Sequence, residues 1–231
     1  MDLHILSAGA AQGVVKALQP AFSADASVEL KGTFGAVGII KEKLLAGASC
    51  DVVILTAALI EELTKTGQIV AGSGAPLGRV KTGVAVRSGD PVPDVSSPGS
   101  LKASMLAARG IYFPDPERAT AGIHFVNVLK QLGIYGEVER FLRPYPNGAT
   151  AMRHLAQATE SGLIGCTQVT EILYTDNVTL AGPLPQAFEL ATVYSAAVCS
   201  KAGQPDIARR FVRLLTSEQS RSVRAEGGFE F

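Results

Sequence analysis

Strand-like and helix-like segments alternate along this chain from its first residues. Residues 3–7 and 50–56 are apolar, strand-like runs, and the second is β-branched throughout its middle, which is typical of a strand covered on both faces. After each run, apolar residues recur at the three-to-four spacing of an amphipathic helix, as in residues 57–67. Strand, helix, strand, helix with short glycine-rich connections predicts a parallel sheet and an α/β fold.

The same alternation returns in the second half of the chain. Residues 79–89 form another strand-like run, and residues 88–100 are the segment richest in Pro, Ser and Asp, which we interpret as a surface segment leading into a second lobe. Beyond it we expect helices within 100–108, 121–133, 149–162 and 205–223, and strands at 110–113, 163–167 and 189–200. A chain of 231 residues, 47% of them hydrophobic, has room for one generous core or two modest ones.

The charge balance excludes several classes of partner. Lys plus Arg and Asp plus Glu both number 21, so no basic excess favours a nucleic acid or an anionic membrane surface. Aromatic residues make up 6% and Trp is absent, which disfavours a stacking platform for bases. No apolar run approaches the length of a membrane span, so we expect no membrane insertion.

The N-terminus enters a strand-like run directly, without the basic and apolar regions of a signal peptide. This predicts a cytoplasmic protein if Met1 is native. The alternative is a periplasmic protein whose export signal has been removed.

Cysteine and histidine usage predicts neither a disulfide framework nor a metal site. Cys50, Cys166 and Cys199 each lie among small or apolar residues, and no Cys-x-x-Cys pair occurs, so we interpret all of them as buried free thiols. The three histidines are scattered along the chain. We expect no metal and no cofactor.

Small residues cluster where strands end and helices begin. Ligands of open α/β sheets bind at the carboxyl ends of the strands, where helix N-termini favour negative charge. The candidate ligand-binding residues at these connections are Ser7, Gly9, Ala10, Thr33, Gly35, Ala36, Thr56, Arg118, Thr120, Ala121, Gly122 and Gln168. The alternative is that they are ordinary connections, because α/β loops are generally rich in small residues.

The stretch YFPDPERATAGIHF, residues 112–125, is the most informative of these connections. An apolar run stops at Pro114, and a polar segment containing Arg118 and Thr120 leads into a helical pattern. It is either a plain connector or a clamp for an anion, in which Gly122 clears space and the helix start supplies N–H donors.

Several motifs together resemble a known family. LHILSAGA, AGASCDVVILT, DPERATAGIHF and GPLP, in this order, resemble the molybdate-binding-protein-like branch of the type II periplasmic binding proteins over nearly the whole chain. The resemblance implies two α/β lobes joined by a two-strand hinge, with an anion closed in the cleft between them. It also implies a discontinuous first lobe of residues 1–83 plus 192–231, and a second lobe of residues 84–191.

The sequence departs from that family at the positions that hold molybdate. Where molybdate binders offer serine and tyrosine hydroxyls, this chain has Ala10, the cluster at Ala36, and Gln168. An arginine fork with amide and hydroxyl donors suits planar carboxylates. We therefore expect a small anionic ligand that is an organic carboxylate rather than molybdate.

Two functions remain open from the sequence. The first is a solute-binding-protein-like receptor for a di- or tricarboxylate. The alternative is suggested by a resemblance to aconitate isomerases, cofactor-free enzymes that shift a double bond by proton transfer, for which His124 or Glu171 would relay the proton. Lys31 and Arg153 are further clamp candidates, although solvated surface charge is the simpler interpretation of both. A sensor domain resembling LysR-type regulators is a weaker third reading, since no DNA-binding helix pair precedes it.

Overall fold

The computed structural model describes residues 1–231 and divides into two compact units, each with its own core. Unit 1 comprises Met1–Val80 and Thr192–Phe231, and unit 2 comprises Lys81–Ala191. Unit 1 is therefore built from two separate stretches of chain. The chain divides at 80/81 and 191/192, whereas the predicted boundaries are 83/84 and 191/192.

The sheet of unit 1 has the strand order β2-β1-β3-β9. Its strands are β1 (Asp2–Ala8), β2 (Glu29–Gly35), β3 (Val52–Thr56) and β9 (Ala191–Val198). β1 is parallel to both β2 and β3, whereas β9 runs antiparallel to β3. β3 is buried along its first four residues, as the continuous apolar run predicts. The carboxyl ends of β1, β2 and β3 thus lie at one edge of this sheet.

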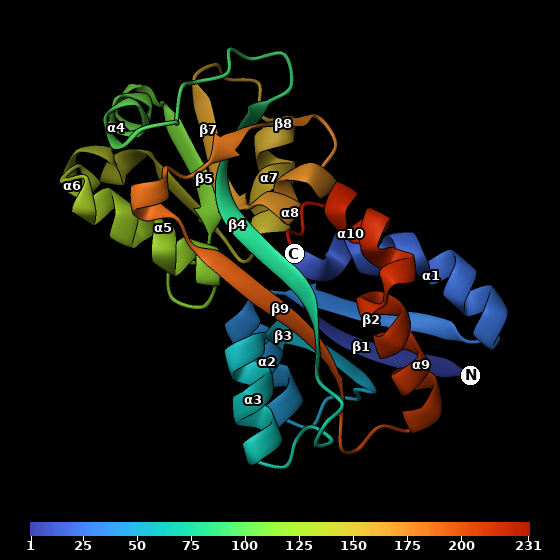
Figure 1. Ribbon diagram of the computed structural model, residues 1–231. Helices are drawn as coiled ribbons and strands as arrows, with labels where there is room; N and C mark the ends of the chain where they lie inside the picture. The colour runs from blue at the N-terminus through green and yellow to red at the C-terminus, as the bar shows by residue number, and fades with distance from the viewer. The chain divides into compact units, whose positions relative to one another are not determined.

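Helices cover both faces of the unit 1 sheet (Figure 1). They are α1 (Gln12–Ala26), α2 (Val37–Leu45), α3 (Ala57–Lys65), α9 (Pro205–Thr216) and α10 (Arg221–Glu226), with short 3-10 turns at Gly9–Ala11 and Glu218–Ser220. α1 packs against α9, where the rings of Phe22 and Phe211 lie 4.8 Å apart. α2 and α3 lie on the other face. This doubly covered sheet is the α/β arrangement that the alternation predicts.

The sheet of unit 2 has the order β4-β7-β5-β6, with β8 also paired to β4. Its strands are β4 (Ala75–Arg87, which begins in unit 1), β5 (Gly110–Pro114), β6 (Leu142–Tyr145), β7 (Leu163–Gln168) and β8 (Val178–Pro183). β5, β6 and β7 are parallel, and β4 is antiparallel to β7 and β8. Because β5 and β7 are parallel neighbours in register from Gly110↔Leu163, their carboxyl ends also share an edge.

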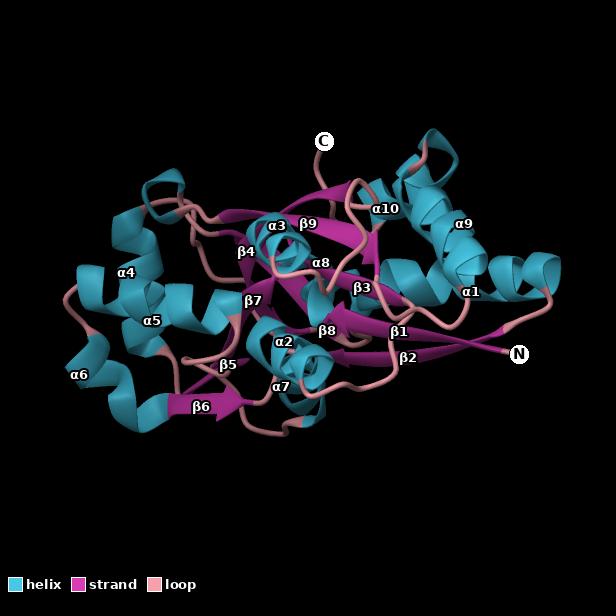
Figure 2. Ribbon diagram, turned by 90° about the horizontal axis from the view of Figure 1, so that it is seen from below, coloured by secondary structure: helices cyan, strands magenta, loops and turns pink.

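The helices of unit 2 are α4 (Pro98–Ala107), α5 (Thr120–Gln131), α6 (Tyr135–Val138), α7 (Gly148–Gln157) and α8 (Val169–Tyr174), with 3-10 turns at Glu139–Phe141 and Gln186–Phe188 (Figure 2). Three of them, α5, α7 and α8, directly follow the parallel strands β5, β6 and β7. α5 contributes Phe125 to a core centred on Phe113 of β5, with ring centroids 5.6 Å apart. α7 packs Met152 and Leu155 against β7 on the other face.

The last helix differs from its prediction. The apolar spacing predicts one helix up to residue 223, but the structure ends α9 at Thr216, because Ser217 adopts an extended conformation. The Arg224 guanidinium, 4% exposed, bonds the carbonyls of Thr216, Ser217 and Leu77. The bonds to Thr216 and Ser217 satisfy carbonyls at the end of α9. A buried arginine in α10 thus caps the C-terminus of the preceding helix.

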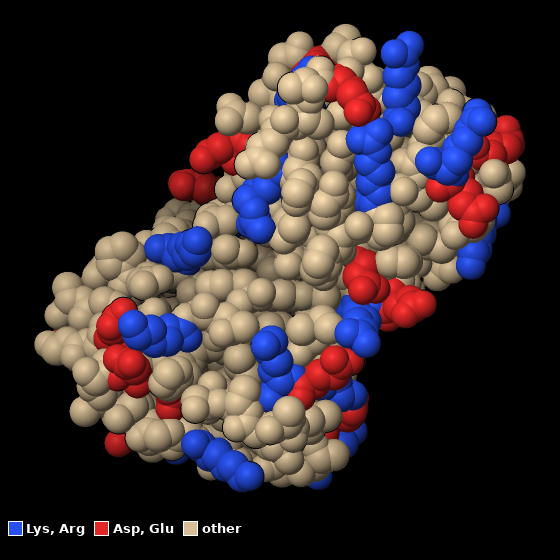
Figure 3. All heavy atoms as spheres, turned by 180° about the vertical axis from the view of Figure 1, so that it is seen from behind, with Lys and Arg blue, Asp and Glu red and all other residues tan.

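Charged side chains of both signs are interspersed over the face drawn in Figure 3. This fits the zero formal charge of the chain. No helix is long and apolar enough to cross a membrane.

Candidate functional site

Three helix starts meet at the carboxyl edge of the unit 1 sheet. They follow β1, β2 and β3, and their N-cap residues are Ala8, Ala36 and Thr56. In none of them does the N-cap side chain bond a helix N–H, so the first-turn donors are left open. Open N–H groups at helix starts favour a negatively charged partner.

Five of the predicted ligand-binding residues of unit 1 lie at this edge of the sheet. Gly9, Ala10, Gly35, Ala36 and Thr56 lie where strands pass into helices. Small residues there leave the backbone N–H groups approachable.

Ser7 and Thr33 are placed less favourably for a ligand. Ser7 is fully buried, and its hydroxyl donates its only proton to the carbonyl of Ala8 at 2.9 Å. Thr33 is an exposed residue inside β2, paired with Leu6, rather than at the strand's end.

In unit 2, α5 also begins without a side-chain cap. Its N-cap is Ala119, so the N–H groups of Thr120, Ala121 and Gly122 have no intrahelical partner. The loop before it is shaped by Asp115, whose Oδ1 accepts from the backbone N–H groups of Glu117 at 2.7 Å and Arg118 at 3.0 Å. The Arg118 side chain is exposed.

Gly122 has a packing role that the sequence did not predict. A Cβ at this position would lie 2.3 Å from the carbonyl oxygens of both Pro114 and Asp115. The glycine therefore clears space for the chain's own backbone, and allows α5 to approach the end of β5 closely.

The corner where β7 passes into α8 holds buried polar groups that have no hydrogen-bond partner. Gln168, the last residue of β7, is 3% exposed, and neither its Oε1 nor its Nε2 is bonded. The Oγ1 atoms of Thr82, which is the register partner of Gln168 on β4, and of Thr170 are also buried and unbonded. Each such group costs about 1–3 kcal/mol when left unsatisfied. Such a concentration of orphaned groups is typical of a site that binds a polar ligand.

Glu171 lies next to this corner and is fully engaged. Its buried carboxylate accepts from the Thr167 hydroxyl at 2.6 Å and from the backbone N–H groups of Gly148, Ala149 and Gln168. Burial raises the pKa of the Glu171 carboxyl, and these hydrogen bonds oppose the shift. The carboxyl thus occupies first-turn donors of α7, whereas the start of α5 has no side-chain cap.

The remaining predicted charged residues make local contacts. His124 Nε2 lies 2.7 Å from the carbonyl oxygen of Phe188, which ties α5 to the turn at Gln186–Phe188. Lys31 pairs with Glu29 on the surface, and Arg153 donates to Thr150 at 2.9 Å. Lys31 and Arg153 are both exposed, and each contacts a residue of its own strand or helix, β2 and α7 respectively.

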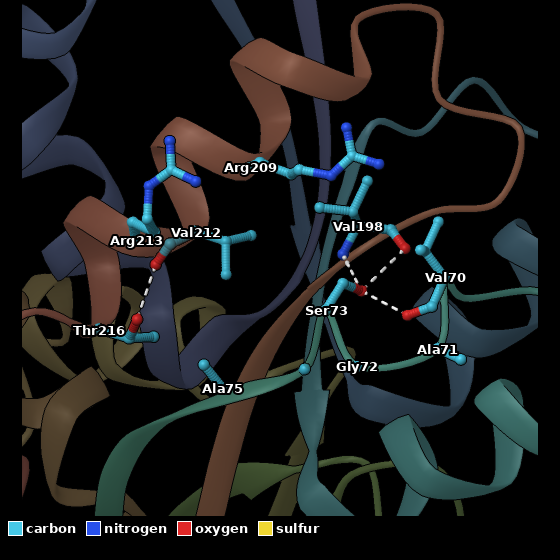
Figure 4. Close-up of a pocket in the computed structure, with 11 residues that line it drawn as sticks. Val70, Ala71, Gly72, Ser73, Ala75, Val198, Arg209, Val212, Arg213 and Thr216 are labelled. Carbon is cyan, nitrogen blue, oxygen red and sulfur yellow. Dashed lines mark hydrogen bonds between the residues drawn. The ribbon is translucent and has the colours of Figure 1, made fainter.

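A separate hollow of about 410 Å³ lies elsewhere in unit 1 (Figure 4). The loop 70–75 forms one wall, and α9 contributes Arg209 and Arg213. The Ser73 hydroxyl in this wall is already bonded to the carbonyl of Val70 and the N–H of Val198. Val198 pairs with Val52 at the amino end of β3, so this hollow is at the sheet edge opposite to the open helix starts.

Comparisons with known proteins identify the family. The model of the bacterial extracellular solute-binding protein family matches residues 3–230. This chain belongs to that family. The resemblance read from the sequence motifs and the predicted type II periplasmic-binding-protein fold, with two α/β units, are both confirmed.

Individual relatives of this solute-binding protein are distant. It is 25% identical over 237 residues to an aconitate isomerase from Pseudomonas sp, covering 99% of this chain and 87% of the relative. The periplasmic molybdate-binding protein of Azotobacter vinelandii superposes with a TM-score of 0.83 at 17% identity, covering 99% of both chains. The sulfate-binding protein SubI of Mycobacterium tuberculosis H37Rv superposes with a TM-score of 0.76 at 16% identity, covering 99% of this chain and 86% of the other.

Sequence reasoning missed two of the orphaned hydroxyls of this solute-binding protein. Thr170 follows Gln168 by two residues, so its position next to a predicted site residue was an available signal. Thr82 lies 86 positions from Gln168 in the sequence, and only the β4–β7 register brings them together. A local pattern carries no information about that pairing.

Proposed function

We propose that this solute-binding protein binds a small organic anion, most specifically a di- or tricarboxylate. The observation that carries the proposal is the unbonded, buried amide of Gln168, at the same sheet edge as the open start of α5. The amide offers two donors and an acceptor, while the helix start favours negative charge. A ligand with both carboxylate and neutral polar oxygens can bind to the Gln168 amide and to the start of α5 at the same time.

The residues at the positions of molybdate ligands support a carboxylate over a tetrahedral oxyanion. Ala10 and Ala36 offer backbone N–H groups but no hydroxyl. Arg118 and Thr120 flank the start of α5, and a guanidinium binds a planar carboxylate through two parallel hydrogen bonds. The placement of the ligand between the two lobes stays a prediction of the family resemblance.

The relatives support a small anion as the ligand, and one of them supports a tricarboxylate in particular. Two of the solved structures that share this fold are named as molybdate- and sulfate-binding proteins, and the aconitate isomerase is named for a tricarboxylic acid. The family's description as extracellular also favours the periplasmic alternative for this chain over the cytoplasmic one.

The second candidate function is isomerisation of an aconitate-like acid. The full-length similarity to an aconitate isomerase favours it. Its proton relay would be Glu171 or His124, but the first is held by four donors and the second by the Phe188 carbonyl. A relay requires one of them to release these partners, so the receptor function needs fewer changes.

The test is a thermal-shift panel of molybdate, sulfate, citrate, tricarballylate and cis- and trans-aconitate, followed by proton NMR of each stabilising compound. Stabilisation by an unchanged tricarboxylate supports the receptor. Interconversion of cis- and trans-aconitate establishes the isomerase. Stabilisation by molybdate or sulfate alone contradicts the carboxylate proposal.

A substitution of Gln168 tests whether the ligand binds at this residue. Gln168→Leu removes the orphaned amide at similar volume, so we expect weaker ligand binding by at least tenfold together with an unliganded protein as stable as the wild type or more so. Gln131→Ala, an exposed change at the end of α5, is the control and leaves both quantities unchanged. Equal affinity in Gln168→Leu and the control would remove Gln168 from the site.

A further inference from the structure

Two cysteines far apart in the sequence lie side by side in unit 1. The Sγ atoms of Cys50 and Cys199 are 3.0 Å apart, although 149 positions separate the residues. Both side chains are buried, and both thiols are free. The chain's third cysteine, Cys166, lies in unit 2, on β7.

The backbone holds this pair in place. Val52 pairs with Val198 on the antiparallel strands β3 and β9, and the N–H of Cys199 donates to the carbonyl of Asp51 at 2.9 Å just beyond that pair. Cys50 precedes β3 in backbone that is not part of the strand. The β3–β9 ladder therefore fixes the backbone immediately beside both cysteines.

The two thiols are already in contact through a hydrogen bond. The Cys199 thiol donates to the Cys50 sulfur, and the Cys50 thiol donates to the Val52 carbonyl at 3.3 Å. A disulfide requires sulfurs about 2.05 Å apart, so the two atoms need to approach by only about 1 Å. Small rotations about the side-chain bonds of two neighbouring cysteines are enough for such an approach.

We propose that Cys50 and Cys199 form an intramolecular disulfide when the chain meets a small-molecule disulfide oxidant. The thiolate of one cysteine attacks a sulfur of the oxidant, forms a mixed disulfide and releases one thiolate. The second cysteine then attacks the protein sulfur of that mixed disulfide and expels the other half. The two protein thiols lose two electrons and two protons, and the oxidant is reduced to two thiols.

The bond joins the two stretches of chain that make up unit 1. Cys50 belongs to Met1–Val80 and Cys199 to Thr192–Phe231. Cross-linking distant residues restricts the unfolded chain and stabilises the native state, typically by enough to raise the melting temperature by about 5–15 °C in a chain of this size.

The environment of the pair makes the reaction slow in the folded protein. The pKa of the Cys199 thiol is raised by its hydrogen bond to Cys50, by burial and by the nearby Asp51 carboxylate. The protonated thiol is a poor nucleophile. We therefore expect the bond to form during folding, and to resist small reductants once it is buried.

The experiment is refolding of the full chain from denaturant in reduced or oxidised glutathione, followed by thiol counting in denaturant and by mass spectrometry of proteolytic peptides. After refolding in oxidised glutathione we expect one free thiol, Cys166, and a linked pair of peptides containing Cys50 and Cys199. Reduced refolding leaves all three thiols free. The oxidised protein melts about 5–15 °C higher than the reduced one.

Two variants control the assignment. Cys166→Ala leaves the pair intact, so its oxidised form has no free thiol and the same rise in melting temperature. Cys50→Ala abolishes the linked peptide and the effect of the oxidant. The proposal is overturned if the oxidised wild-type chain keeps three thiols, links Cys166, or carries glutathione on Cys50 without an internal bond; these readouts do not depend on whether Cys50→Ala folds.

Discussion

Asp51 illustrates how single buried polar residues hold this protein together. It is 3% exposed, and its carboxylate accepts from the N–H of His4 at 2.7 Å and from the N–H of Gln204 at 2.9 Å. It thereby ties β1 to Gln204, the N-cap residue of α9. Arg224 and Glu171 are bonded in a similar way, whereas the polar atoms of Gln168 are not. Buried polar residues of the first kind stabilise the fold, and those of the second kind are candidates for ligand binding.

Glu171 predicts a pH dependence of stability in unit 2. Because burial raises the folded-state pKa of the Glu171 carboxyl above its usual value, the stability that it contributes is fully present below the unfolded-state pKa and is lost as the pH rises through the folded-state pKa. We expect the stability of the wild type relative to Glu171→Gln, measured by urea unfolding, to fall as the pH rises above the usual pKa of Glu, about 4.3. Glu137→Gln, the same substitution at an exposed position, is the control. A difference between wild type and Glu171→Gln that grows with pH would contradict the raised pKa.

Two glycines of unit 2 provide a matched pair of substitutions. Gly122→Ala places a Cβ 2.3 Å from two carbonyl oxygens, and we expect it to lower the free energy of unfolding by about 3 kcal/mol or more. Gly136→Ala, in α6, meets no atom within 4 Å and is expected to be neutral or to stabilise by up to about 1 kcal/mol. Urea unfolding of both variants checks the prediction. Equal effects would show that the close approach of α5 to β5 is not restrictive.

At the scale of elements, the helices differ in how they begin. α4 begins with a reciprocal cap, in which Ser97 and Ser100 each bond the other's backbone N–H, and α7 is capped by Asn147. The helices that follow β2, β3 and β5 have no such side-chain cap. A cap satisfies donors that a ligand would otherwise use, so the starts of α4 and α7 are structural and not available to a ligand.

Ser97→Ala tests the structural kind of helix start. Loss of the reciprocal cap leaves first-turn N–H groups of α4 without their partner, so we expect a loss of about 1 kcal/mol in the free energy of unfolding. Ligand affinity should be unchanged, because α4 does not contribute to the proposed site. Ser222→Ala, an exposed serine in α10, is the comparison and should leave stability within about 0.5 kcal/mol. A drop in ligand affinity with Ser97→Ala would place α4 nearer to function than we propose.

At the scale of the whole molecule, the two units differ in how they are built from the chain. Unit 2 is one continuous stretch with its own apolar clusters around Phe113 and Met152. Unit 1 needs its C-terminal stretch, which supplies β9 beside β3 and α9 against α1. The two units should therefore differ in whether they can be separated from the rest of the chain.

Fragments test this difference. We expect residues 81–191 to fold alone, with a cooperative thermal transition by circular dichroism and dispersed amide signals by NMR. Residues 1–80 alone should remain unfolded, because β3 and α1 lose the partners that cover them. Cooperative folding of residues 1–80, or an unfolded 81–191 fragment, would contradict the assignment of cores to the units.

The sequence alone determined the class of fold, the family and the positions of most long elements. Apolar periodicity reports which face of a segment is buried, and this information is local. The short elements β6, β8, α6 and α8 were missed, since four to six residues contain too little periodicity to be recognised. The break of the last helix at Ser217 was missed for a different reason: it depends on the guanidinium of Arg224.

Tertiary structure alone decided which polar groups are open and which are engaged. Ser7, His124 and Glu171 had the composition of site residues, but each is bonded within the fold, whereas Gln168 is buried without a partner. The contact between Cys50 and Cys199 was equally invisible, because the β3–β9 register joins residues 149 positions apart. Hydrogen bonding and thiol proximity depend on which strands pair and in what register, and no local pattern in the chain specifies that pairing.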